Sequence, residues 1–165
     1  GEAPYLVSRY DTVNGYMIEL SQRIGLLDRK LRIVSENVQT EEDWLKWAIK
    51  SFQNTYGYDW QGDNVLLARE NLLFTFIDYY KAKFDKEPDI NTLKKVAEIL
   101  SWNIWQMDGL KFVIPESCKE VEEGQLTLFD SNVGKQSCPG CARNDPYAHT
   151  GIYCTIQVNT LHLLP

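Results

Sequence analysis

Cysteines late in the chain have the residue type and the spacing of a zinc site. Cys138 and Cys141 are separated by Pro-Gly, a tight turn that lets two thiolates point at one ion. Zn²⁺ takes four tetrahedral sulfur or nitrogen ligands. The other two could be Cys118 with Cys154, or His149 with Cys154. We favour the all-cysteine set of Cys118, Cys138, Cys141 and Cys154, because Cys118 would otherwise be an unexplained thiol. Four protein ligands leave no place for water, so the predicted zinc is structural. The alternative is a set of free or partly buried thiols.

Two acidic residues, Asp59 and Asp108, each follow a short run that could be a strand. Asp59 ends the run Tyr56–Asp59, and Asp108 closes the mixed run that begins at Trp102. An acid at the carboxyl end of a strand, just before a helix, is where open α/β sheets bind ribose hydroxyls. The alternative for Asp59 is a turn acid that only caps a helix. The sequence therefore predicts either a nucleoside-binding edge or a turn at this place.

Helical periodicity surrounds these two runs. Apolar residues three or four positions apart predict helices over residues 19–34, 40–54, 63–84 and 89–100. Thr40 and Asp89 are predicted to cap the second and fourth of these helices. The order helix, strand, helix, helix, strand predicts α/β organisation. We expect the runs that end at Asp59 and Asp108 to be neighbouring parallel strands.

Taken together, these segments resemble the adenine-N6 DNA methyltransferases of restriction-modification systems, which use S-adenosylmethionine. Gly1-Glu2-Ala3-Pro4-Tyr5-Leu6-Val7 is similar to the second half of their cofactor loop, and Tyr56–Asp59 is similar to the strand whose acid binds the cofactor ribose. Asn103-Ile104 through Asp108-Gly109-Leu110 is similar to the strand whose acid lies near the adenine. The resemblance covers residues 1–115 and implies a partial Rossmann-like methyltransferase sheet flanked by helices. It also implies cofactor contacts from Glu2, Asp59, Trp60 and Asp108.

The chain departs from this family where catalysis would take place. No Pro-Pro occurs in it, so the family's Asn/Asp-Pro-Pro-Tyr/Phe motif, which grips the amine of a flipped base, is absent. We therefore expect no catalytic residues here, and a cofactor-binding portion of a methyltransferase that is enzymatic only in a longer context. DNA would be its partner in that context, and a restriction endonuclease is a second candidate. The alternative is a non-enzymatic, zinc-bearing interaction module derived from this fold.

The composition is that of an ordinary globular protein. Of the 165 residues 44% are hydrophobic and 24% are charged, which allows a real core. The formal net charge of −6 argues against an electrostatic nucleic-acid binder unless one segment supplies a basic surface. No apolar run could span a bilayer and no signal peptide is visible. The four cysteines are clustered late in a pattern that suits metal better than a disulfide framework, so we expect a reducing cytoplasm. We predict two parts, a cofactor-binding α/β domain over 1–115 and a cysteine-rich, zinc-binding segment over 116–165.

Overall fold

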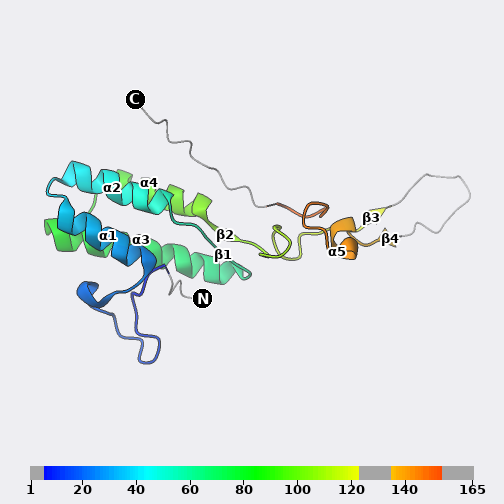
Figure 1. The fold of residues 1–165 in the computed structure, drawn as a ribbon, viewed down its shortest axis with the longest axis horizontal. Coiled ribbons are helices and arrows are strands. Elements are labelled where there is room, and N and C mark those ends of the chain that lie inside the picture. The colour runs from blue at the N-terminus through cyan, green and yellow to red at the C-terminus, as the bar shows by residue number, and fades with distance from the viewer. Residues whose placement is uncertain (1–5, 123–134, 154–165) are drawn as a thin grey trace, which may run out of the picture. The chain divides into compact units, whose positions relative to one another are not determined.

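The computed structural model describes residues 6–122 and 135–153 (Figure 1). In chain order the elements are a 3-10 turn at Leu20–Gln22, α1 (Leu26–Asn37), α2 (Glu41–Gln53), β1 (Gly57–Asp59), α3 (Gly62–Phe84), α4 (Ile90–Asn103), β2 (Ile104–Gln106), β3 (Val121–Glu122), β4 (Lys135–Gln136) and α5 (Pro139–Arg143). None of the helices in these ranges is long and apolar enough to cross a membrane. The described residues fall into two compact units, one of 6–57 and 63–105, the other of 58–62 and 106–153.

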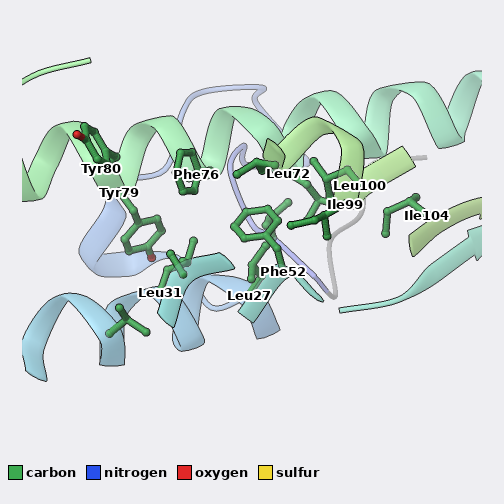
Figure 2. Packing of buried hydrophobic residues seen from close by; sticks show 14 of the residues in the cluster. Leu27, Leu31, Phe52, Leu72, Phe76, Tyr79, Tyr80, Ile99, Leu100 and Ile104 are labelled. Carbon is green, nitrogen blue, oxygen red and sulfur yellow. The ribbon is translucent and has the colours of Figure 1, made fainter. Parts of the chain in front are cut away.

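The first unit is a helical body with an aromatic core. Trp44 on α2 is fully buried, and the centroid of its ring lies 5.6 Å from Phe76, 5.6 Å from Tyr80 and 5.7 Å from Phe84 on α3. Figure 2 shows side chains from α1, α2, α3, α4 and β2 that point toward one another, among them Leu27, Phe52, Leu72, Leu100 and Ile104. Burial of this apolar surface is the main force that holds the four helices together.

The predicted helix caps are confirmed. The Thr40 hydroxyl accepts a hydrogen bond from the Asp43 N–H at the start of α2. The Asp89 carboxylate accepts from the N–H groups of Asn91 and Thr92 at the start of α4. Each cap satisfies backbone donors that have no partner within the helix. Both helices therefore begin where local sequence alone places them.

The helix predicted over residues 19–34 is interrupted. Only Leu20–Gln22 is helical in its first part, Arg23 is extended, and α1 begins after Gly25. The Ser8 hydroxyl accepts hydrogen bonds from the N–H groups of Ile24 and Gly25. A Cβ at Gly25 would lie 2.5 Å from the Cα of Val7, so this position accepts only glycine. A contact with the segment around residue 7, which periodicity cannot reveal, breaks the helix.

The runs that end near Asp59 and Asp108 contribute neighbouring parallel strands, as predicted. β1 and β2 form a two-stranded sheet, and Met107 N–H donates to the carbonyl of Asp59 at 2.9 Å. The second strand is shorter than predicted, because α4 continues through Asn103. Among the described residues no third strand joins β1 and β2, so the partial Rossmann-like methyltransferase sheet is not shown. β3 and β4 form a separate antiparallel pair.

Helix α4 ends at Asn103, and the side chain of Asn103 holds this end of the helix in place. Its side chain is buried and donates to the carbonyls of Phe52 and Gln53, at 3.1 and 3.2 Å. These carbonyls belong to the last turn of α2, where intrahelical donors are lacking. Asn103 thus fastens the end of α4 to the end of α2, which is a structural role.

Candidate metal centre

Four side chains of the second unit converge on one point. Cys118, Cys138, Cys141 and His149 each offer one ligand atom, and these four atoms lie within 4.8 Å of one another. The Nδ1 atom of His149 lies 3.5 Å from the Sγ atoms of Cys118 and Cys138. It lies 3.6 Å from the Sγ atom of Cys141. Three sulfur atoms thus surround one imidazole nitrogen at nearly equal distances.

These distances match a tetrahedral zinc shell. Bonds of about 2.3 Å to sulfur and about 2.0–2.1 Å to nitrogen, at tetrahedral angles, place each sulfur roughly 3.6 Å from the nitrogen. The three observed separations of 3.5, 3.5 and 3.6 Å agree with that value. A Cys₃His set is one of the usual shells of structural zinc. The residues present therefore fit a zinc ion in both chemistry and spacing.

Helix α5 positions the pair Cys138 and Cys141. Cys138 precedes the helix, Pro139 takes its first position, and the Ala142 N–H donates to the Cys138 carbonyl at 2.9 Å. One turn of helix then brings the Cys141 thiol to the same side as Cys138. Gly140 allows the backbone to approach His149, because a Cβ there would lie 2.7 Å from the Cγ, N and Nδ1 atoms of His149.

Paired backbone segments bring Cys118 to the same point. Ile114 N–H donates to the carbonyl of Ile152 at 2.9 Å, and the Ser117 hydroxyl accepts from Ile152 N–H at 3.0 Å. Farther along, the Thr150 hydroxyl accepts from Lys119 N–H at 3.0 Å and donates to the Lys119 carbonyl. Cys118 lies between Ser117 and Lys119, the two residues that form these hydrogen bonds. Its distance in sequence from Cys138 is therefore no obstacle to a shared site.

The Cys138 and Cys118 thiols differ in acidity. Burial raises the pKa of Cys138, but hydrogen bonds outweigh it, above all from Thr150 and then from Cys141 N–H and His149, and lower the pKa to about 5. The Thr150 N–H donates to the Cys138 sulfur at 3.3 Å. Burial, followed by interactions with Cys138 and Cys141, raises the pKa of Cys118 to about 11. Without metal, Cys138 is therefore a thiolate and Cys118 keeps its proton at neutral pH.

Three of the four predicted metal ligands, Cys118, Cys138 and Cys141, meet in this cluster, and His149 is the fourth side chain that could hold a metal. The sequence offered His149 only in a set that also used Cys154, which lies outside the described residues. Gly140 and Gly151 are the two positions where the site requires a close approach. Gly140 lets the backbone approach His149, and a Cβ at Gly151 would lie 3.1 Å from the Cys118 sulfur.

The predicted cofactor residues are not part of the Cys118, Cys138, Cys141 and His149 cluster. Asp59 accepts a hydrogen bond from Gln61 N–H at 2.9 Å, and Asp108 accepts from the N–H groups of Leu110 and Lys111 at 2.9 and 3.3 Å. Both acids therefore accept hydrogen bonds from backbone N–H groups of the turns that follow them. Trp60 is about half exposed. Glu2 lies outside the described residues.

Comparison with known proteins adds no relative. No family model matches the chain, and neither the curated proteins nor the solved structures contain a match. The function is therefore argued from the site itself.

Proposed function

We propose that Cys118, Cys138, Cys141 and His149 bind one zinc ion, and that this ion is the structural centre of the second unit. The observation that carries the proposal is the three nearly equal distances from His149 Nδ1 to the cysteine sulfurs. Thiolate and imidazole ligands in a tetrahedral S₃N arrangement are typical of zinc. All four positions would be filled by protein, so the ion would stabilise the fold and would not activate water.

The zinc ion would contribute much of the folding free energy of this unit. Apart from α5, the described elements between residues 106 and 153 are strands of two or three residues, and so short a set of elements buries little apolar surface. Structural zinc typically contributes about 10–16 kcal/mol of apparent binding free energy near neutral pH. The thiols must stay reduced, which supports a cytoplasmic location.

Metal analysis tests this proposal. Protein purified without chelator should contain close to one zinc per chain, and the double variant Cys138→Ser/Cys141→Ser should contain none. In the parent, chelation should release the zinc and make residues 116–153 open to protease. The helices of residues 26–103 should retain their circular dichroism. A zinc-free parent with an intact second unit would contradict the proposal.

The second candidate function is S-adenosylmethionine binding by a portion of a DNA adenine-N6 methyltransferase. The favouring observation is the parallel pair β1 and β2, with Asp59 at the end of one strand and Asp108 two residues beyond the other. A carboxylate has two oxygens and about four acceptor sites. A carboxylate that accepts a hydrogen bond within a turn therefore still has acceptor sites for a ligand hydroxyl. DNA and a restriction endonuclease would be partners of the longer protein. The competing assignment is a non-enzymatic zinc-bearing interaction module.

Titration calorimetry separates these two assignments. S-adenosylmethionine should bind a version of the chain that is extended at its N-terminus, and bind the 165-residue chain weakly or not at all. Asp59→Ala should weaken binding by the extended version roughly ten- to a hundredfold, the loss of one charge-assisted bond. Glu42→Ala, a change of an exposed acid on α2, is the control. If neither version binds, the chain is the zinc-bearing module only.

A further inference from the structure

A groove between helices α2 and α4 has no role in either proposal of function. The two helices pack against each other in the first unit (Figure 1). The groove between them has a volume of about 540 Å³. None of the zinc ligands and none of the predicted cofactor residues line it.

Lysines dominate the charge of this groove. Lys46 and Lys50 line it from α2 and Lys95 from α4, against a single acid, Glu42. Lys46 and Lys95 are exposed, and within the described ranges none of the three lysines forms an ion pair. The ammonium group of Lys50 lies 4.7 Å from the ring centroid of Trp47, an interaction that leaves its positive charge uncompensated. The groove is thus a local basic surface on a chain of net charge −6.

The other polar side chains of the groove are hydrogen-bonding groups of a particular kind. Gln53, Asn91 and Thr92 line it together with the lysines. Lysine, glutamine, asparagine and threonine are among the side chains that contact nucleic-acid phosphates, although the Thr92 hydroxyl already donates to the Asp89 carboxylate at 2.6 Å. Lysine, asparagine and glutamine can also contact base edges, but arginine, which shares with lysine the commonest specific contact to guanine, does not line the groove. The composition therefore favours recognition of phosphate groups.

The length of the groove suits a chain of phosphates better than a single one. From Lys46 to Gln53 the lining residues of α2 extend for about 10 Å at the rise of an α-helix, and Glu42 lies beyond this stretch. A nucleic-acid strand carries one phosphate per roughly 3.4 Å of duplex axis. Several phosphates therefore fit along the groove, which a single inorganic ion would leave largely empty.

We propose that this lysine groove, lined by Lys46, Lys50 and Lys95, binds the phosphate backbone of a nucleic-acid strand without sequence preference. The binding is electrostatic and depends on salt concentration. It also answers the objection raised by the overall acidity of the chain, because the basic surface is confined to one groove.

Fluorescence anisotropy with a fluorescein-labelled random-sequence DNA duplex tests the proposal on the zinc-loaded chain. Binding should be measurable at low salt, and Lys46→Gln/Lys50→Gln/Lys95→Gln should weaken it at least tenfold. The slope of log affinity against log salt should also fall by about 2 to 3, since each lost phosphate contact removes about 0.9. The control Lys81→Gln/Lys86→Gln/Lys94→Gln removes the same charge from exposed positions outside the groove and should change the affinity less than twofold.

Four results would overturn this inference. They are the absence of binding by the parent at low salt, equal losses in the groove variant and its control, tighter binding of a polyglutamate peptide of equal charge, and displacement of the duplex by inorganic phosphate at the same phosphate concentration. Equal thermal melts of both variants would show that the helical unit stays folded. Zinc content is measured in parallel, so a lack of DNA binding can be distinguished from a lack of bound zinc.

Discussion

His149 Nδ1 and Cys138 Sγ lie 3.5 Å apart although they belong to different segments of the chain. Cys138 precedes α5, whereas His149 follows it and donates its backbone N–H to the hydroxyl of Tyr153 at 2.8 Å. Gly140 allows this approach because its missing side chain leaves room for the imidazole. Cys118 and Cys141 contribute the other two potential ligand atoms beside this pair.

Single substitutions should show that His149 and Cys118 bind the zinc ion and that Cys154 does not. His149→Ala and Cys118→Ser should each lower the zinc affinity at least a hundredfold, because a fourth protein ligand is lost from a closed shell. Cys154→Ser should leave one zinc per chain, and so should His162→Ala, the matched control for the other histidine. Competition with a chromophoric chelator measures these affinities. Zinc loss in Cys154→Ser with retention in His149→Ala would restore the all-cysteine set.

Zinc affinity should rise with pH. The pKa of Cys118 is raised to about 11, so at neutral pH zinc must displace its proton, and the cost grows as the pH falls. The pKa of Cys138 is lowered to about 5, so this thiolate requires no proton displacement above that range. We expect the apparent affinity to fall about tenfold per unit between roughly pH 8 and pH 6 for the Cys118 proton. A flat profile in the same competition assay would show that the thiol is already ionised.

Gly140→Ala should weaken the zinc site without touching a ligand. The added Cβ would lie 2.7 Å from three atoms of His149, so the imidazole must move away from the sulfurs. We expect at least a tenfold loss of zinc affinity. Ala142→Ser, an exposed neighbour on the same short helix, should have little effect. Equal affinities of the parent and the Gly140→Ala variant would mean that the loop relaxes freely.

The helical unit should depend on Trp44 and not on zinc. Trp44 is fully buried among Phe76, Tyr80 and Phe84, and its indole N–H donates to the Ser35 hydroxyl at 2.9 Å. Trp44→Ala should therefore cost about 3–5 kcal/mol of unfolding free energy. Trp47→Ala, on the exposed side of the same helix, should cost less than about 1 kcal/mol. Urea unfolding followed by circular dichroism at 222 nm, a helix band, measures both. Comparable losses in the two variants would contradict this description of the core.

Features that depend on local sequence could be predicted, and features that depend on distant contacts could not. The caps at Thr40 and Asp89 follow from residue type and the next three positions. The break before α1 depends on Val7 meeting Gly25, and the extension of α4 depends on Asn103 reaching the end of α2. Spacing alone indicated zinc at Cys138 and Cys141. It could not pair Cys118 with His149, because that pairing requires the backbone hydrogen bonds between residues 114–119 and 150–152.

X-ray absorption at the zinc edge of the purified chain tests the central claim most directly. The account predicts one zinc per chain with a first shell of three sulfurs at about 2.3 Å and one nitrogen at about 2.0–2.1 Å, without a bound water. The imidazole should also give outer-shell scattering that disappears in His149→Ala. A first shell of four sulfurs, or an oxygen ligand from solvent, would contradict the Cys₃His centre. A folded second unit that contains no zinc would contradict it as well.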